Sequence, residues 1–362
     1  MDRIIKIKKS DNYRIVAISD IHARLDLIEE LLEKVQLREE DYLVIIGDFI
    51  NKGPNSIGCL NLVRELLKRP KTICLKGNHE LFIGRVLDSF DYSKRLLDYL
   101  RQDNYKTLIH DFAEIEGKSL HDYSYEEFFS LMNATYYDDL NFIKSLPIIL
   151  EFDDFLFVHG GYDRSFDAVE DENKFLKYDN YKELGHVNEK TVVVGHWPTA
   201  NLRTHTFTNV PFFEEEKNII MIDGGMGVKT GGEMNALVIN KTNGLISYEH
   251  KFVNDFEATT IKKKMTFNQE QTVLVNYPHF EVEVIEVGEE LTLCKHVHSG
   301  NHLSVINSVV KEAEEGHVLD IVYTNKFFNL EVGDVVGIID RKADYVLVKY
   351  EHEIGWVHKS QI

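Results

Sequence analysis

The chain has few cysteines, no long apolar run and no excess of positive charge, and each absence excludes a class of protein. Its 362 residues contain only three cysteines, Cys59, Cys74 and Cys294, too few and too widely spaced for a disulfide framework. No uninterrupted apolar run approaches the ~18 residues that a membrane-spanning helix needs. Residues 1–9 are charged before they become apolar, unlike a signal peptide. We therefore expect a cytoplasmic protein that does not associate with membranes.

The formal charge of the chain argues against binding to nucleic acid in general. Lys and Arg number 41 and Asp and Glu number 60, which gives a net charge of −19. A protein that binds nucleic acid or an anionic membrane through its general charge carries a basic surplus instead. An acidic protein binds phosphate only where positive charge is concentrated locally, often by a metal ion. With 43% hydrophobic residues, the chain is long enough for two domains of roughly 100–200 residues each.

Short apolar runs alternate with segments of helical period over the first part of the chain. Each apolar run ends in polar residues, and the first two are followed by apolar residues at i, i+3, i+4 spacing. The expected strands are 14–19, 42–46, 72–75, 148–152, 155–158, 191–194, 219–222, 236–239 and 246–252, and the expected helices are 25–35 and 57–67. The repeated order of strand, polar loop and helix predicts a layered α/β fold.

The composition changes twice along the chain and so indicates domain boundaries. Residues 85–146 are mostly of helical character and are expected to form an insertion in a domain spanning 1–260. A lysine run and a polar stretch over 261–271 indicate a linker. Residues 272–362 contain short strand-like runs and predict an all-β domain.

The end of the chain has the pattern of a small β-barrel. From about residue 317 it contains Gly333-Asp334 at an expected hairpin, an alternating strand at 345–348 and a Gly-Trp-Val strand at 355–357. This pattern resembles Src-homology-3 (SH3)-like barrels. The resemblance implies either a barrel packed on the rest of the protein or a module that binds a peptide or protein partner.

Polar side chains follow five of the expected strands. The pieces are Asp20-Ile21-His22, Gly47-Asp48, Gly77-Asn78-His79-Glu80, His159-Gly160-Gly161 and Gly195-His196. Open α/β sheets bind their ligands at the carboxyl ends of the strands, so these side chains are expected to converge. Each piece alone is common in ordinary loops, but five in order, each after an apolar run, predict one site.

The residue types at these strand ends suit divalent metal ions. Carboxylate, imidazole and amide oxygen favour Mn, Fe or Zn bound without thiolate. Six such ligands are too many for one tetrahedral metal, and they suit two metals that share a carboxylate. We expect two divalent ions, with Mn favoured.

The order Asp-x-His, Gly-Asp, Gly-Asn-His-Glu, His-Gly-Gly and Gly-His-x-Pro-Thr resembles the calcineurin-like metallophosphoesterases over residues 12–255. It is most similar to the phosphoprotein phosphatase branch, which contains serine/threonine protein phosphatases and bacterial diadenosine tetraphosphate hydrolases. The resemblance implies a four-layer α/β/β/α sandwich with a dinuclear metal centre at the strand ends.

The resemblance also implies a role for each matching residue. Asp20 and His22 would bind the first metal, Asp48 would bridge both, and Asn78, His159 and His196 would bind the second. A metal-bridging hydroxide would attack phosphorus in line. His79 would act as the general acid that protonates the leaving alkoxide, and Asn78 would also contact the phosphate.

Two residues depart from the branch's usual Gly-Asp-x-x-Asp-Arg-Gly, because Asn51 and Lys52 replace the Asp and Arg. Asn51 can hydrogen-bond to His79 but carries no charge to stabilise its cation. Lys52 supplies positive charge to the phosphate without the planar fork of arginine. A second phosphate-binding arginine is usual after the fourth motif, and the candidates are Arg164 and, as alternatives, Lys177 and Arg203.

The sequence therefore predicts a dinuclear metal-dependent phosphoesterase similar to the serine/threonine protein phosphatases, with a phosphoprotein or nucleotide substrate. One alternative is a hydrolase of diadenosine tetraphosphate or another nucleotide, since the metal machinery is shared. The other is a degenerate phosphatase that acts as a binding or regulatory module, suggested by Asn51 and Lys52.

Overall fold

The computed structural model describes residues 3–8, 12–102, 104–163, 171–185, 189–268 and 271–362. The chain forms two compact units, which are treated separately below. The first lies within residues 1–198, 211–228 and 233–253, and the second within 199–210, 229–232 and 254–362.

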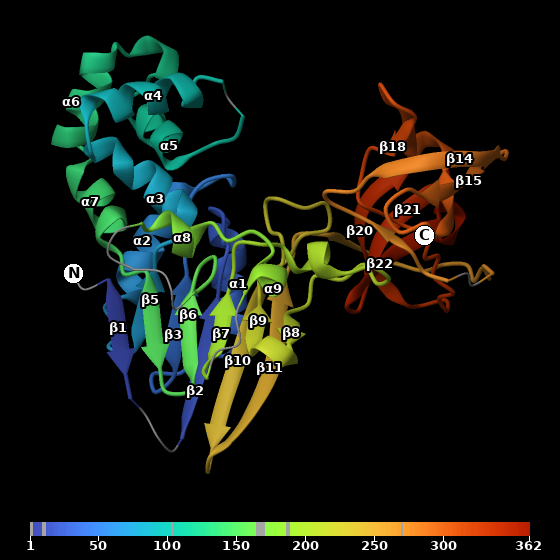
Figure 1. The fold of residues 1–362 in the computed structure, drawn as a ribbon, viewed down its shortest axis with the longest axis horizontal. Coiled ribbons are helices and arrows are strands. Elements are labelled where there is room, and N and C mark those ends of the chain that lie inside the picture. Colours follow the sequence, from blue (N-terminus) through green and yellow to red (C-terminus); the bar gives the residue numbers. More distant parts are fainter. Residues whose placement is uncertain (1–2, 9–11, 103, 164–170, 186–188, 269–270) are drawn as a thin grey trace. The chain divides into compact units, whose positions relative to one another are not determined.

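The first unit is built on two β-sheets (Figure 1). The six-stranded sheet has the order β1 (Ile4–Ile7), β5 (Ile149–Phe152), β6 (Phe155–Val158), β7 (Thr191–Val194), β9 (Ile219–Met221) and β8 (Phe212–Glu214). The five-stranded sheet has the order β11 (Leu245–Val253), β10 (Met234–Thr242), β2 (Tyr13–Ile18), β3 (Tyr42–Ile46) and β4 (Thr72–Leu75). β2, β3 and β4 are parallel, as are β6, β7 and β9, so each group ends at one edge of its sheet.

The apolar strands divide their side chains between two cores. On β2, Ile15 and Ala17 join a core shared with the other sheet, whereas Val16 and Ile18 join a core shared with the helices. This division follows from the two-residue period of a strand. Because both faces of β2 and β3 are buried, these strands appear in the sequence as continuous apolar runs rather than as alternating ones.

Helices surround the pair of sheets. The helices that follow β2, β3 and β4 are α1 (Leu25–Lys34), α2 (Ser56–Leu66) and α3 (Asn78–Gly84). The segment between β4 and β5 then adds η1 (Arg85–Leu87), α4 (Phe90–Leu100), α5 (Leu108–Ile115), η2 (Leu120–Asp122), α6 (Tyr125–Ala134) and α7 (Tyr137–Ser145). Three short helices follow the strands of the other sheet: α8 (Asn173–Leu176), α9 (Tyr181–Leu184) and η4 (Glu215–Lys217).

The second unit consists largely of antiparallel strands. One sheet contains β12 (Glu257–Thr260), β20 (Val335–Lys342), β21 (Tyr345–Tyr350) and β22 (Glu353–His358). Another has the order β16 (His302–Ile306), β15 (Leu291–His296), β14 (Glu281–Val287), β18 (His317–Leu319) and β17 (Val310–Glu312). β13 (Leu274–Val275) pairs with β19 (Tyr323–Thr324), and short turns of 3₁₀ helix lie at η3 (Thr199–Leu202), η5 (Asn307–Val309) and η6 (Lys359–Gln361). The predicted class, an α/β fold with a C-terminal all-β region, is confirmed, whereas the SH3-like fold from residue 317 stays a prediction.

The second unit includes residues that the sequence pattern groups with the first part of the chain. β12 pairs with β20, and Ile261, at the start of the expected linker, is buried among residues of β20–β22. Ala200 and Phe207 are buried in a core with residues of β13–β22. This division does not test the expected domain limits at 260 and 272, which stay predictions.

Two strands of the first unit were not predicted. β1 and β8 are four and three residues long and lie at the two edges of the six-stranded sheet. Short edge strands carry too little apolar pattern to be recognised in the sequence. In the part of the chain that the structure describes, no helix combines the length and apolar character needed to cross a membrane.

Candidate metal centre

The five sequence motifs lie at the ends of five strands, β2, β3, β4, β6 and β7. Two groups of possible metal ligands form there, and within each group the ligand atoms lie within 4.8 Å of one another. One group contains His22, Asp48 and His79, and the other contains Asp48, His159 and His196. Asp48 belongs to both, which is the place expected for a bridging carboxylate.

The turns that carry these side chains adopt an uncommon backbone conformation. Asp20, His22, Asp48 and His196 have φ angles of 53°, 46°, 52° and 66°, in the left-handed region. Few residues other than glycine adopt this conformation, and such strain concentrates at functional sites. A Cβ on Gly77 would lie 2.2 Å from Oδ1 of Asp48, so this motif requires glycine to let two strand ends approach.

The surroundings of His159 suit a cation. Its Nδ1 donates to the carbonyl of Ile46 at 2.7 Å, which orients the ring. Its Nε2 lies 3.0 Å from Oδ1 of Asn78 and 3.3 Å from Oδ2 of Asp48. Burial opposes protonation of this ring, but the adjacent Asp48 carboxylate raises the pKa of His159. Three groups with lone pairs therefore converge on one point, where either a proton or a metal ion can hold them together.

His196 is positioned by two carboxylates. Its backbone N–H donates to Oδ2 of Asp20 at 3.0 Å, and its Nε2 lies 2.9 Å from Oδ1 of Asp179. When the neutral ring donates Nε2–H to Asp179, Nδ1 keeps its lone pair for a ligand. The ring of His196 also contacts that of His159, at 5.3 Å between centroids.

Asp20 is buried beside the ligand groups without belonging to either. Its Oδ1 lies 3.9 Å from Nε2 of His22, and burial raises the pKa of Asp20, opposed by the charge of His159. Asp223, at the end of β9, is also buried, and burial together with the charge of Asp20 raises its pKa well above the usual range. Nδ1 of His22 is buried and has no hydrogen-bond partner among the described residues.

His79 lies at the edge of the site, in contact with a side chain from each of three loops. Nδ2 of Asn51 lies 3.1 Å from Nδ1 of His79. The rings of His22 and Tyr105 meet it edge-on, at centroid distances of 5.2 and 5.8 Å. Burial, opposed by the carboxylate of Asp48, lowers the pKa of His79 to about 4.

The structure describes one of the two expected phosphate-binding cations, Lys52. Lys52 has a φ of 68°, and its backbone N–H donates to the carbonyl of Lys106 at 2.8 Å. Burial lowers the pKa of His22 and of His79, and the charge of Lys52 lowers both further. Arg164 lies outside the described residues. Its alternative Arg203 belongs to the second unit, where Nη2 donates to the carbonyl of Val210 at 3.1 Å.

Sequence reasoning gave no role to Glu80 or Tyr105, nor to Asp179 beside His196. Oε2 of Glu80, fully buried, accepts from the backbone N–H of Asp48 and Gly77, each at 2.8 Å, so it fixes two ligand-bearing turns together. Burial and the charge of Asp48 raise the pKa of Glu80 to about 7. Its place as third residue of the helix that begins in this motif is a signal for capping. No sequence pattern indicates a role for Tyr105, because it lies in the segment between β4 and β5, away from the five motifs.

The donor set fits a pair of divalent ions. The buried carboxylate of Asp20 lies within electrostatic range of the buried carboxylates of Asp48 and Asp223. Buried charges are stable in proteins when they are paired or bind metals. The fold and this set of imidazole, carboxylate and amide ligands define a metal-dependent phosphoesterase.

The family comparison agrees with this class. The family described as calcineurin-like phosphoesterase matches residues 13–222. This is more than half of the chain, and the chain belongs to the calcineurin-like phosphoesterases. The predicted family and the predicted class of metal-dependent enzyme are confirmed by this match.

Curated relatives match shorter parts of the chain. The symmetrical bis(5'-nucleosyl)-tetraphosphatase of Pasteurella multocida (strain Pm70) is 37% identical over 67 residues, which are 18% of this chain and 24% of that protein. The asymmetrical bis(5'-nucleosyl)-tetraphosphatase PrpE of Oceanobacillus iheyensis is 28% identical over 123 residues, which are 29% of this chain and 49% of that protein. The chain thus spans about a quarter to a half of the length of these relatives.

Solved structures resemble the chain more distantly. The match to a putative diadenosine tetraphosphatase covers 69% of this chain and 98% of that chain, with 17% identity and a TM-score of 0.44. A serine/threonine phosphatase from Saccharomyces cerevisiae, similar to human PP5, covers 71% and 85%, with 12% identity and a TM-score of 0.41.

Proposed function

We propose that this protein is a dinuclear metal-dependent phosphoesterase that hydrolyses phosphate esters in the manner of the serine/threonine protein phosphatases. The observation that carries the proposal is the place of Asp48, whose carboxylate belongs to both groups of ligand atoms. A shared carboxylate between two sets of imidazoles is the arrangement that a pair of metal ions needs.

The side chains of the site would divide the work of the reaction. His22, His159 and His196, with Asp20, Asp48 and Asn78, would hold two divalent ions, which, when bound, would activate a water and neutralise the phosphoryl oxygens. Lys52 would add positive charge beside the phosphate. His79 would donate the proton of Nε2 to the leaving oxygen, with its ring held by Asn51.

A hydrolase of diadenosine tetraphosphate or another nucleotide is the second candidate. It is supported by the names of the curated relatives, which are bis(5'-nucleosyl)-tetraphosphatases. The third candidate, a degenerate phosphatase that only binds, is supported by the neutral Asn51 in place of the usual Asp. The intact ligand groups argue against it.

The first experiment measures turnover of p-nitrophenyl phosphate with and without Mn²⁺. We expect turnover that a chelator abolishes, and a loss of about 10²-fold or more in Asp48→Asn, which removes the shared carboxylate. Asp153→Asn is the matched control, because Asp153 pairs with Lys241 in the turn where β5 ends and β6 begins, at the opposite end of β6 from His159. No turnover with any divalent metal, in a protein that binds two metal ions, would favour the binding module.

A second experiment separates the two substrate classes. Phosphate release from a phosphoserine peptide is compared with hydrolysis of diadenosine tetraphosphate under the same metal. A higher kcat/KM for the peptide supports the first candidate, and a higher kcat/KM for the dinucleotide supports the second.

Three finer expectations belong to this proposal. Mn²⁺ is the favoured metal, and ranking Mn, Fe and Zn by kcat tests it. The expected cytoplasmic location is supported by the three cysteines, which are buried and free, and imaging of the tagged full chain tests it. A partner of the C-terminal region is supported by exposed apolar side chains on the hairpin of β14 and β15, Ile285, Val287 and Leu293. Cross-linking of the native chain and of Val287→Ser tests whether that hairpin holds a partner.

A further inference from the structure

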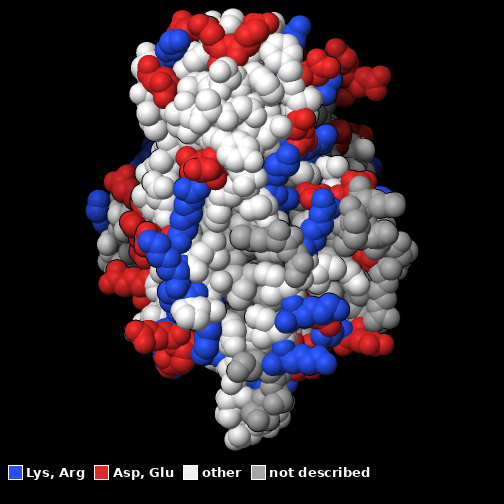
Figure 2. Space-filling view, turned by 90° about the vertical axis from the view of Figure 1, so that its left-hand side faces the viewer, with Lys and Arg blue, Asp and Glu red and all other residues white. Residues whose placement is uncertain are grey.

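Positive charge gathers on one face of this acidic protein. Figure 2 views the molecule from the side on which β1 and α7 lie in Figure 1, and Lys and Arg side chains run down this face between areas of Asp and Glu. A local surplus of cations on a chain with a net charge of −19 indicates a site for an anion.

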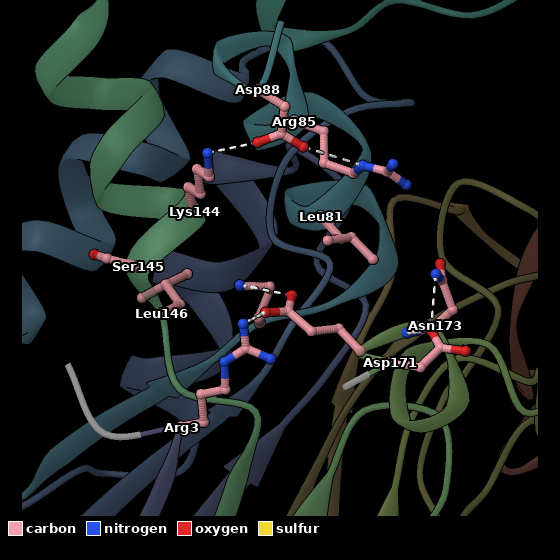
Figure 3. Close-up of a pocket in the computed structure, with 11 residues that line it drawn as sticks. Arg3, Leu81, Arg85, Asp88, Lys144, Ser145, Leu146, Asp171 and Asn173 are labelled. Atoms are coloured by element: carbon pink, nitrogen blue, oxygen red, sulfur yellow. Dashed lines mark hydrogen bonds and ion pairs between the residues drawn. The ribbon is translucent and has the colours of Figure 1, made fainter. Parts of the chain in front are cut away.

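A cavity of about 460 Å³ opens beside α3 in the first unit (Figure 3). Four cationic side chains line it, Arg3, Lys76, Arg85 and Lys144. They come from four places: before β1, the end of β4, the end of α3 and α7. Among the described residues, none that lines the cavity belongs to either group of possible metal ligands.

On one side of the cavity, two cations share a single carboxylate. Nζ of Lys76 lies 2.9 Å from Oε2 of Glu172, and Nη2 of Arg3 lies 3.1 Å from Oε1 of the same side chain. Lys76 is almost fully buried. A buried ammonium group requires an anionic partner, and Glu172 provides one here.

On the other side, the same arrangement is repeated. Nζ of Lys144 lies 2.5 Å from Oδ1 of Asp88, and Nε of Arg85 lies 3.3 Å from Oδ2. The guanidinium group of Arg85 also stacks over the ring of Tyr92. Among the described residues, no hydrogen bond involves the two terminal amino groups of Arg85, which remain for a ligand. Asp171 also lines the cavity, so its four cations and three carboxylates leave one net positive charge in the lining.

We propose that this cavity binds a phosphate dianion, either free or at the end of a small organic phosphate, at a site separate from the metal centre. The net positive charge of the lining favours an anion. Its oxygens accept several charge-assisted hydrogen bonds, and the planar fork of Arg85 suits two of them. Glu172 acts as an internal competitor, because its carboxylate occupies Lys76 and Arg3 when no ligand is bound.

The test measures binding of inorganic phosphate by calorimetry to the full chain after chelation and dialysis, so that metal ions do not contribute. Lys144→Met should weaken binding about tenfold or more, because a charge-assisted hydrogen bond is lost. Glu172→Gln should tighten binding several-fold, because the carboxylate that competes with the ligand for Lys76 is removed. Lys68→Met is the matched control, since Lys68 is exposed, pairs with Glu65 and does not line the cavity.

The opposite signs expected for Lys144→Met and Glu172→Gln separate binding from a loss of structure. Equal affinities in all four proteins, or no binding at millimolar phosphate, would overturn the proposal. Binding that requires Mn²⁺ and disappears in Asp48→Asn would assign the phosphate to the metal centre and would overturn it as well. With ADP as a second probe, an affinity above that of phosphate supports the site for organic phosphates, and an equal affinity supports it for free phosphate.

Discussion

The side-chain nitrogen of Asn51, Nδ2, faces Nδ1 of His79. Oδ1 of Asn51 accepts from the backbone N–H of Leu108 at 2.9 Å, so Nδ2 is the atom that lies 3.1 Å from His79. A donor at this place bonds to an unprotonated Nδ1 and leaves the ring proton on Nε2. The family's usual Asp would instead accept from Nδ1–H and favour the imidazolium.

Asn51→Asp should therefore raise turnover of esters whose leaving group needs a proton. We expect kcat for a phosphoserine peptide to rise about tenfold, because the new carboxylate stabilises protonated His79. Turnover of p-nitrophenyl phosphate should change by less than about twofold, because p-nitrophenolate leaves without protonation. Steady-state kinetics on both substrates measures the difference.

The same substitution in a His79→Asn background is the control. There it should have no selective effect, because the group that it acts on is absent. An equal change for both substrates in the parent protein would show that Asn51 does not act through His79.

Glu80→Gln should loosen the two turns that hold Asp48 and Asn78. An amide cannot accept with both of its terminal atoms, so the buried bonds to one of the two oxygens are lost, either those from the N–H groups of Asp48 and Gly77 or those from Phe49 and Ile50. We expect a loss of about 2–3 kcal/mol in the free energy of unfolding, measured by urea titration, and weaker Mn²⁺ binding. Glu127→Gln is the control, since Glu127 caps α6 in the same way at an exposed site and should cost less.

Metal binding should stabilise the folded protein. At a free Mn²⁺ concentration of about 100 times Kd, each site adds about 2.7 kcal/mol. This corresponds to a rise of about 5–10 °C in Tm for a domain of this size. Differential scanning calorimetry of chelated and Mn²⁺-loaded protein measures the shift. His159→Gln should reduce it strongly, whereas His279→Gln, at a partly buried position in the second unit, should leave it unchanged.

A chain that ends at residue 260 should fold poorly. Phe207 and Ala200 are buried in a core with residues of β13–β22, and the carbonyl of Phe207 accepts from the backbone N–H of Ile354 at 2.8 Å. The truncation would leave these apolar side chains without their core. In the full chain, Phe207→Ala should lower the free energy of unfolding by about 3–5 kcal/mol.

Chemical denaturation of that variant and gel filtration of the truncated chain test this division. A truncated chain that is monomeric and as stable as the native first unit would contradict it. The exposed Phe213→Ala, on β8, is the control and should change stability little.

The strands that carry the candidate metal ligands could be predicted because their signals are local. Each of the runs 14–19, 42–46 and 72–75 is apolar on both faces and ends in a polar motif, and the structure places β2, β3 and β4 there. Parallel strands end at one edge of a sheet, so the convergence of Asp20, Asp48 and Asn78 follows from the sequence pattern.

Other features of the site could not be predicted from any local pattern. Tyr105 and Leu108 contact His79 and Asn51 from a segment more than twenty residues away in the chain. The sequence also gives no reason for Glu172 to lie on Lys76, 96 residues before it. Such contacts depend on how the loops pack, and that packing cannot be predicted from side-chain type and spacing.

The sequence by itself determined the family, the ligand types and the order of the motifs. These depend on short segments in which apolar period and residue chemistry act together. Only the tertiary structure decided which nitrogen Asn51 turns to His79, which cations meet in the cavity beside α3, and that Phe207 belongs to the second unit. The physical reason is that each of these results from contacts between distant segments, whose geometry is set by the packing of the whole core.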